Sequence, residues 1–289
     1  MTNDNPILSI GMATYNDYDG VYFTIQSLRL YHSICNTDDV EFIIIDNNPD
    51  GNESKFLKQL INRDVKEGQY IPVKDQTSSF VKYRTPDYAT GQYIIIMDCH
   101  VLLVPGAIKS LLQYYDENPN TKNLIQGPML SNSLTKYNTH WKPEFRGNMY
   151  GCWSHDEKKF QEGNPFEIPM QGNALLSFNK DAWHGINPNF KGFGGEQGYI
   201  QDKFRQWGGK CICLPQFQWV HRFGRPNGVP FKCSLDDRVW NYFLGYLDLY
   251  KDPNHDMITQ IYDHFKTQIP GKRVDYVLNK LKKNPRLWM

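Results

Sequence analysis

Apolar residues along the chain occur in short continuous runs that alternate with segments of helical periodicity. Continuous runs without polar alternation indicate strands that are buried on both faces, as in a parallel sheet. They occupy residues 7–14, 40–45, 69–73 and 93–104. Residues 20–31, between the first and second runs, and residues 54–61, between the second and third, carry apolar positions three and four apart. This spacing indicates helices. The order strand, helix, strand predicts an α/β fold.

The same patterns predict the rest of the chain. Residues 78–89 begin as a helix that Pro86 is expected to break. Residues 135–169 show little periodicity and many aromatic side chains, which is typical of a functional loop, and we assign them to the acceptor side of a cleft. Residues 235–289 are amphipathic helix with a break at Asp252. The remaining expected elements are helices at 105–115, 179–184 and 198–207 and strands at 123–129, 170–178, 210–214 and within 216–223.

Chemistry-bearing residues follow the central apolar run, which contains Asp98 and His100 where the strand is expected to end. Side chains two positions apart leave a strand on the same side, and ligands of open α/β sheets bind outside the carboxyl ends of the strands. One oxygen and one nitrogen ligand suit a divalent ion such as manganese. Asp98 and His100 are therefore candidate metal ligands; the alternative is a turn cap and a buried histidine with satisfied hydrogen bonds.

Polar residues also mark the other strand ends. Asp46 ends the second strand and either accepts from a base or ribose group or caps a turn. Lys82 and Arg84 precede the central strand and either contact phosphate or lie at the surface. No glycine-rich phosphate loop follows the first two strands, which disfavours dinucleotide oxidoreductases and P-loop enzymes.

A glycine-rich segment precedes the helix expected at 198–207. Glycines permit tight backbone conformations, so Glu196 is expected at the start of this helix beside a cleft. Its alternative role is that of a structural carboxylate at a helix N-terminus. Gly172 permits close approach of the backbone in the strand at 170–178. His221 adds a third residue of a metal-binding type after another short strand.

Composition narrows the functional class. The 289 residues include 32 basic and 31 acidic side chains, a formal charge of +1, so no global field marks the chain for nucleic acid or a membrane surface. Six scattered cysteines indicate reduced thiols. The sequence has no apolar run near the roughly 18 residues of a membrane span and no signal-peptide pattern at its start. We therefore expect a cytoplasmic protein without a membrane span.

Four motifs in a fixed order give a resemblance to a known family. They are Asp98-Cys99-His100, Gly194-Gly195-Glu196, Phe204-Arg205-x-Trp207-Gly208-Gly209 and Val220-His221-Arg222-Phe223. In this order they resemble the nucleotide-sugar glycosyltransferases of the GT-A fold. The stronger likeness is to the catalytic domain of the polypeptide N-acetylgalactosaminyltransferases, and the broad inverting family two is more distant. The resemblance covers about residues 7–224.

The resemblance implies a fold, a domain organisation and a set of site residues. The fold is Rossmann-like, with a mixed, mostly parallel sheet flanked by helices. A catalytic domain spans 1–234, with a nucleotide-binding half at 1–100 and an acceptor and catalytic half at 101–234, and a helical extension spans 235–289. The metal ligands are Asp98, His100 and His221. The nucleotide contacts are Thr14, Tyr15, Asn16, Asp46, Arg84 and Asp98. The catalytic residues are Glu196, Gln197, Arg222 and Arg225. The acceptor and sugar contacts are Trp153, Gly172, Asn173, Gly195 and Trp207.

The resemblance implies metal-dependent transfer of a hexose or N-acetylhexosamine from a UDP-sugar to an acceptor hydroxyl, with Mn²⁺ or else Mg²⁺. Inverting family two enzymes place Glu-Asp where this chain has Glu196-Gln197. Because an amide is not a useful base at neutral pH, we expect retention. The acceptor is left open among a glycan, a protein, a small molecule and a hydroxymethylated base of phage DNA. The alternatives are a non-catalytic sugar-nucleotide or carbohydrate-binding protein and, third, a nucleotidyltransferase.

Overall fold

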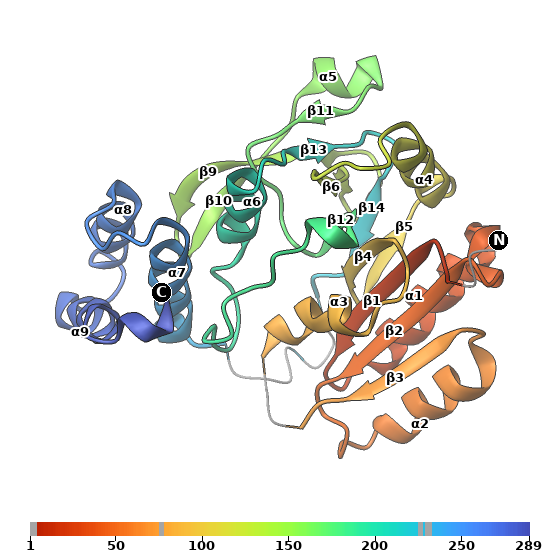
Figure 1. Cartoon of the computed structure of the whole chain (residues 1–289), viewed down its shortest axis with the longest axis horizontal. Coiled ribbons are helices and arrows are strands. Elements are labelled where there is room, and N and C mark those ends of the chain that lie inside the picture. The colour runs from red at the N-terminus through yellow and green to blue at the C-terminus, as the bar shows by residue number, and fades with distance from the viewer. Residues whose placement is uncertain (1–4, 75–77, 225–227, 229–232) are drawn as a thin grey trace.

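The computed structural model describes residues 5–74, 78–224, 228 and 233–289. Within these residues the centre is an eight-stranded sheet in the order β11-β13-β6-β12-β4-β1-β2-β3 (Figure 1). Its strands are β1 (Leu8–Thr14), β2 (Val40–Asp46), β3 (Gly68–Pro72), β4 (Tyr93–Asp98), β6 (Leu124–Gln126), β11 (Phe166–Glu167), β12 (Leu175–Asn179) and β13 (Cys211–Cys213). Four neighbouring pairs are parallel and three antiparallel. The expected mixed, mostly parallel sheet is confirmed.

The carboxyl ends of the central strands meet at one edge of this sheet. β1 pairs in parallel with both β2 and β4, so that Thr14 lies opposite Asp46 and Ala13 lies opposite Asp98. The side chains that follow these strands therefore share one edge, which is where open α/β sheets bind their ligands.

Helices cover both faces of the sheet. They are α1 (Tyr18–Tyr31), α2 (Ser54–Gln59), α3 (Thr85–Tyr88), α4 (Ala107–Glu117), α5 (Glu157–Glu162), α6 (Gln197–Gln206), α7 (Leu235–Tyr250), α8 (Asp256–Phe265) and α9 (Gly271–Lys282). Alternate side chains of β4 pack into two different clusters. Ile96 joins the cluster that contains Leu244 of α7 and Leu281 of α9, whereas Ile95 joins the cluster of α1 and α4. The carboxyl-terminal helices thus share a hydrophobic core with the sheet.

A second, four-stranded sheet extends from the end of β4. It has the order β5-β14-β7-β8 and consists of β5 (Val101–Leu103), β14 (Trp219–His221), β7 (Met129–Leu130) and β8 (Tyr137–Asn138). The apolar run 93–104 is therefore two strands in different sheets, with Cys99 and His100 in the turn between them. The expected strand 123–129 divides in the same way into β6 and β7, because Pro128 has no N–H for a sheet ladder.

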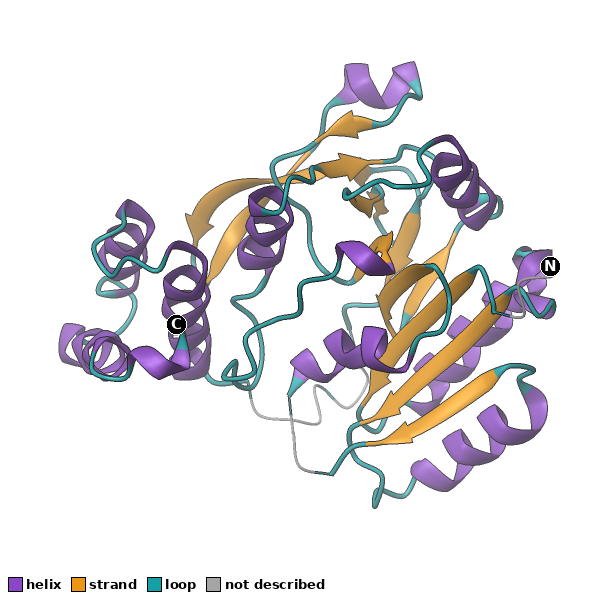
Figure 2. Cartoon of the chain, in the orientation of Figure 1, coloured by secondary structure: helices purple, strands orange, loops and turns teal. Residues whose placement is uncertain are grey.

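The segment 135–169 is not the long loop that the sequence predicts. It contains an antiparallel hairpin of β9 (His140–Arg146) and β10 (Met149–Ser154), followed by α5 and β11 (Figure 2). Most side chains of β9 are exposed, and Trp141 is its one buried residue. Apolar Trp141, Pro143 and Phe145 alternate with charged residues along β9, and Trp141 and Phe145 pack in the hydrophobic core, so the expectation of little periodicity is wrong for this strand.

Three smaller expectations differ from the structure. Pro86 does not break a helix but lies in the first turn of α3, a position where its missing N–H costs nothing. The strand expected at 170–178 begins only at Leu175, and the helix expected at 179–184 is a short 3₁₀ turn, Lys180–Ala182. Among the helices of the described ranges, none combines the length and the apolar character that crossing a membrane requires.

Candidate active site

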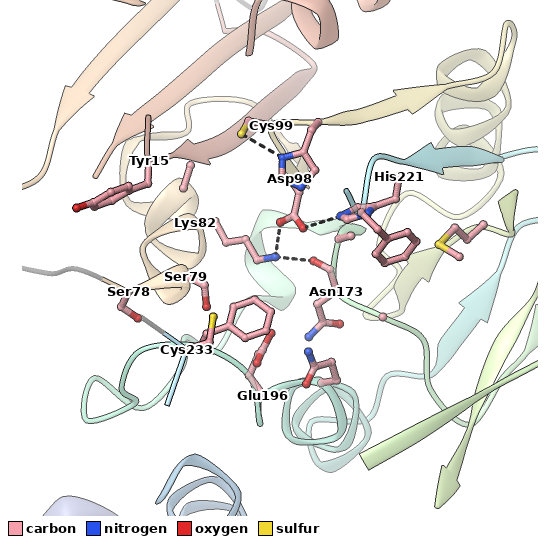
Figure 3. Close-up of a pocket in the computed structure, with 18 of the residues that line it drawn as sticks. Tyr15, Ser78, Ser79, Lys82, Asp98, Cys99, Asn173, Glu196, His221 and Cys233 are labelled. Atoms are coloured by element: carbon pink, nitrogen blue, oxygen red, sulfur yellow. Dashed lines mark hydrogen bonds and ion pairs between the residues drawn. The ribbon is translucent and has the colours of Figure 1, made fainter. Parts of the chain in front are cut away.

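A pocket of about 340 Å³ opens at the carboxyl ends of β1 and β4 (Figure 3). Its walls come from segments far apart in the sequence: the two strand ends, the 3₁₀ turn Ser79–Arg84, the approach to β12, the start of α6, β14 and the hairpin. The residues that line it include Thr14, Tyr15, Asn47, Lys82, Asp98, His100, Trp141, Trp153, Gly172, Asn173, Glu196, Gln197, His221 and Phe223.

Three of these residues form a cluster that has the composition of a metal site. Ligand atoms of Asp98, His100 and His221 all lie within 4.8 Å of one another, and His221 Nε2 is 3.3 Å from Asp98 Oδ2. The fold explains the meeting, because β14 pairs antiparallel with β5 and places His221 opposite Val101, beside the turn that carries His100. One carboxylate and two imidazoles fit a borderline-hard divalent cation such as manganese.

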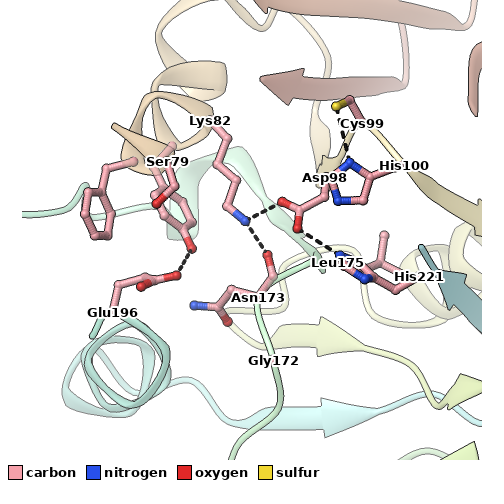
Figure 4. A network of polar contacts seen from close by, with 12 residues as sticks. Ser79, Lys82, Asp98, Cys99, His100, Gly172, Asn173, Leu175, Glu196 and His221 are labelled. Carbon is pink, nitrogen blue, oxygen red and sulfur yellow. Dashed lines mark hydrogen bonds and ion pairs between the residues drawn. The ribbon is translucent and has the colours of Figure 1, made fainter. Parts of the chain in front are cut away.

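Lys82 compensates the charge of this cluster from the opposite side (Figure 4). Its Nζ donates to Asp98 Oδ1 at 2.7 Å and to the carbonyl oxygen of Asn173 at 2.8 Å, and only 7% of the residue is exposed. Burial alone would raise the pKa of Asp98. The positive charge of Lys82 and the hydrogen bond from His221 outweigh burial and hold that pKa well below its usual value. Asp98 is therefore an anion available to a cation.

Glu196 lies across the pocket at the start of α6 and is 4% exposed. The hydroxyl of Tyr83 donates to its Oε1 at 3.3 Å, while burial raises the pKa of its carboxyl despite the nearby charge of Lys82. The preceding Gly195 has φ of 95°, and a Cβ there would lie 2.8 Å from Asn241 Cβ. Only glycine fits this tight entry into the helix, which aims Glu196 and Gln197 at the pocket.

Buried polar atoms without a hydrogen-bond partner concentrate in this pocket. Among the described residues they include Thr14 Oγ1, Asn47 Oδ1, Trp141 Nε1, Asn173 Nδ2, Glu196 Oε2, Gln197 Oε1 and His221 Nδ1, all from residues that line it. Buried polar groups are almost always paired in native proteins, because an unpaired one costs about 1–3 kcal/mol. Donors and acceptors left unpaired in one cavity indicate a polar ligand rich in hydroxyl and carbonyl groups.

Aromatic rings form one wall of the pocket. Trp141 and Trp153 meet edge to face with centroids 4.8 Å apart, and Trp153 and Phe223 are 45% and 62% exposed. A Cβ on Gly172 would lie 2.8 Å from Trp141 Cζ2, so a larger residue would displace this ring. Exposed rings beside unpaired polar atoms suit the apolar face of a sugar.

The structure brings most of the expected site residues together and leaves others apart. Those that line the pocket are Thr14, Tyr15, Asp98, His100, Trp153, Gly172, Asn173, Glu196, Gln197 and His221. Gly195 lies next to it, as described above. Arg225 falls outside the described residues.

Five expected residues do not line the pocket and have partners elsewhere. Asn16 accepts from Asn48, and Asp46 accepts from the hydroxyl of Tyr70. The guanidinium of Arg84 donates to Tyr88, and that of Arg222 donates to Asp17. Trp207 stacks on His184 at the far end of α6. Eleven positions separate Trp207 from Glu196, which at about 1.5 Å per residue is roughly 16 Å along the helix. Trp207 therefore lies away from this pocket, and its assignment to the acceptor site stays a prediction.

Sequence reasoning also missed site residues. The sequence leaves Lys82 open between a phosphate contact and a surface position, whereas the structure packs its 3₁₀ turn so that Lys82 faces Asp98. Asn47, Ser78, Ser79 and Phe193 line the pocket without a sequence signal. The aspartate of the first loop, Asp17, is recognisable in the sequence only as a helix cap.

Residues 9–181, more than half of the chain, match the model of glycosyl transferase family 2. The sequence has no match among curated proteins. The fold is similar to the crystal structure of GalNAc-T7 with UDP, GalNAc and Mn²⁺, with a TM-score of 0.61 and 12% identity. That likeness covers 91% of this chain and 55% of that chain, so this chain spans little more than half of GalNAc-T7.

The fold is also similar to the mannosyltransferase PcManGT from Pyrobaculum calidifontis in complex with GDP-Man and Mn²⁺. The TM-score is 0.55 at 10% identity, and the likeness covers 97% of this chain and 76% of that chain. These two likenesses confirm the GT-A fold expected from the sequence. Together with the match over residues 9–181, they show that the chain belongs to glycosyl transferase family 2.

Proposed function

We propose that this protein is a metal-dependent glycosyltransferase that moves a hexose or N-acetylhexosamine from a UDP-sugar to an acceptor hydroxyl. The observation that carries the proposal is the set of unpaired polar atoms that converge on one pocket beside the Asp98, His100 and His221 cluster. The family supports glycosyl transfer, and the titles of both similar structures name a nucleotide or nucleotide sugar with Mn²⁺.

In this proposal Asp98, His100 and His221 hold one Mn²⁺. A bound divalent cation would supply Lewis-acid stabilisation of the diphosphate leaving group, an effect worth several kcal/mol. Lys82, which already contacts Asp98 and the backbone of Asn173, keeps the Asp98 carboxylate oriented and adds a positive charge beside the leaving group.

The nucleoside is assigned to the edge formed by β1 and β2. Thr14, Tyr15 and Asn47 line the pocket there, and Thr14 Oγ1 and Asn47 Oδ1 are unpaired. Asp46 does not line the pocket, but its Oδ1 accepts from the backbone N–H of Asn48 at 2.9 Å in the loop that follows β2. We propose that Asp46 shapes this loop for the ribose. The domain assignment follows: residues 1–100 bind the nucleotide, 101–234 bind sugar and acceptor, and 235–289 support the second half.

The sugar and the acceptor are assigned to the opposite half of the pocket. Three residues that line this half have unpaired polar atoms: Asn173 Nδ2, Glu196 Oε2 and Gln197 Oε1. The partly exposed ring of Trp153 is available for stacking. Glu196 orients the sugar hydroxyls or the acceptor. The acceptor is a glycan, a protein, a small molecule or a hydroxymethylated DNA base.

We propose retention, because Gln197 stands where an inverting enzyme of this family would have its catalytic aspartate. Inversion with Glu196 as the base is the second candidate, and two observations favour it: family 2 membership and the raised pKa of the Glu196 carboxyl, which makes it more basic. The anomeric configuration of the product, read from proton NMR coupling constants, separates the two.

The proposed function is tested by release of nucleoside diphosphate from a panel of UDP- and GDP-sugars, with Mn²⁺ or with chelator, in the wild type and in His221→Ala. We expect manganese-dependent release from a UDP-sugar that the variant loses. Donor binding without any release, with candidate acceptors present, would instead support a non-catalytic binding protein, and release of pyrophosphate would support a nucleotidyltransferase.

A further inference from the structure

Asp17 does not line the pocket, yet it contacts two residues of the site. It follows β1, caps the N-terminus of α1 and has a buried side chain. Its Oδ2 lies 3.0 Å from His100 Nδ1. Its Oδ1 accepts from Arg222 Nη2 at 2.7 Å and from the backbone N–H of Gly20 at 3.2 Å. Oδ2 thus faces the ring nitrogen and also accepts from the Cys99 thiol at 3.6 Å, while Oδ1 accepts from the guanidinium and the helix N-terminus.

This contact decides which ring nitrogen of His100 is free. An ionised carboxylate only accepts hydrogen bonds, so His100 Nδ1 must carry the proton that faces Asp17. Neutral imidazole has one N–H, and Nε2 is then a lone-pair donor available to the cluster with Asp98 and His221. Histidines that bind metals commonly donate their second ring nitrogen to a carboxylate, which fixes the tautomer and raises ligand basicity.

His221, in contrast, has no such support among the described residues. Its Nδ1 is buried without a hydrogen-bond partner, and its Nε2 faces Asp98. The orientation of the cluster therefore depends more on His100 than on His221. Arg222 adds a second tie, because its backbone N–H donates to the carbonyl oxygen of His100 at 3.2 Å while its side chain holds Asp17. β14 and the turn after β4 are locked together through Asp17.

We propose that Asp17 is a positioning residue that fixes His100 as the Nδ1–H tautomer, with Nε2 directed to a metal ion, and that Arg222 acts through Asp17. The part of this inference that concerns metal affinity rests on the proposed function; the part that concerns the tautomer does not. Asp17 does not line the pocket; its contacts with His100 and with Arg222, the residue after His221, carry its effect to the site.

The test compares Asp17→Asn with the wild type. Asparagine is as good a helix cap as aspartate, and its carbonyl can still accept from Gly20 and Arg222. Its amide then faces His100 Nδ1 as a donor, which stabilises the opposite tautomer, as happens when the aspartate that orients a catalytic histidine is replaced by asparagine. Asp156→Asn is the matched control, because Asp156 is also a helix cap, accepting from Lys159 N at 3.1 Å, and lies outside the pocket.

Two readouts are measured, Mn²⁺ affinity by calorimetry and the His100 tautomer by ¹⁵N NMR of the metal-free protein. We expect Asp17→Asn to weaken Mn²⁺ binding by about 10–100-fold and to move the ring proton from Nδ1 to Nε2. Asp156→Asn should change neither readout. Melting curves verify that each variant is folded.

The outcomes separate the inference from the proposed function. If the wild type and Asp17→Asn bind Mn²⁺ with the same affinity and show the same His100 tautomer, the inference is overturned and the metal site stands. Wild type that binds no Mn²⁺ but shows a tautomer controlled by Asp17 overturns the metal site and supports the positioning role. If Asp17→Asn does not fold, the wild-type spectrum decides alone, because an Nε2–H tautomer there overturns the inference.

Discussion

Lys82→Met removes one cation from the candidate site and leaves an unbranched side chain that is one atom shorter. In the wild type, Lys82 Nζ is 2.7 Å from Asp98 Oδ1 and 2.8 Å from the carbonyl oxygen of Asn173. The side chains of Lys82 and Asp98 are 9% and 28% exposed. Methionine would leave the Asp98 carboxylate in a largely buried place, where His221 is its one remaining hydrogen-bond partner among the described residues.

Breaking a buried ion pair by removing one partner costs about 3–5 kcal/mol. Because Asp98 keeps some solvent and one hydrogen bond, we expect the lower end, about 3 kcal/mol. At about 2–4 °C per kcal/mol for a chain of this size, the melting temperature of the metal-free variant should fall by roughly 6–12 °C. A divalent cation on Asp98 replaces the missing charge, so Mn²⁺ should stabilise Lys82→Met more than it stabilises the wild type.

The assay is thermal unfolding of both proteins with chelator and with Mn²⁺. Lys203→Met is the matched control, since Lys203 Nζ is 3.9 Å from Asp248 Oδ2 and both side chains are similarly buried, but neither residue lines the pocket. That variant should lose stability without a larger response to Mn²⁺. A metal-free Lys82→Met protein as stable as the wild type, or an Mn²⁺ shift equal in all three proteins, would refute the reasoning.

Three further predictions follow from the pocket. Glu196→Gln should lower turnover by about 100-fold yet stabilise the ligand-free protein. Burial raises the folded-state pKa of the Glu196 carboxyl, so the stability that this carboxyl contributes is complete below about pH 4 and is lost as pH rises through the folded-state pKa. The advantage of the glutamine variant in melting temperature should therefore grow with pH, and a constant difference would contradict this. Trp153→Ala should leave folding intact, because the ring is 45% exposed, but raise the acceptor KM about 3–10-fold through lost stacking; an unchanged KM would remove Trp153 from the site. Gly172→Ala should cost about 1–3 kcal/mol by overpacking against Trp141; wild-type melting would show that the ring moves freely.

The sequence predicted the parts of the site that depend on local pattern. A continuous apolar run located β4, and residues two apart at its end identified Asp98 and His100, because side-chain direction in a strand is fixed by the backbone. The start of α6 with Glu196 was readable from its glycines. Local sequence pattern does not show which strand pairs with β5. The contact between His221 and Asp98 was therefore predicted from the order of the motifs alone.

The parts that the sequence did not predict depend on register between distant segments. Lysine and aspartate are residue types that usually lie at the surface. Lys82 and Asp17 are buried here because the 3₁₀ turn and α1 pack against the strand ends. The hairpin β9–β10 has few fully buried side chains, and its period-two signal, the alternation of Trp141, Pro143 and Phe145 with charged residues, is short. Trp207 matched a motif but faces His184, because a motif gives spacing along a helix and not the direction of each side chain.

The most direct test of the account is a calorimetric titration of UDP into the wild type and into Asp98→Asn, each with Mn²⁺ and with chelator. Since the nucleotide diphosphate and the Asp98, His100 and His221 cluster are assigned to one pocket, Mn²⁺ should strengthen UDP binding to the wild type by at least about tenfold, which is 1.4 kcal/mol. Asp98→Asn should lose this gain. UDP that binds the wild type equally well in chelator, or a manganese effect that survives in Asp98→Asn, would contradict the central claim.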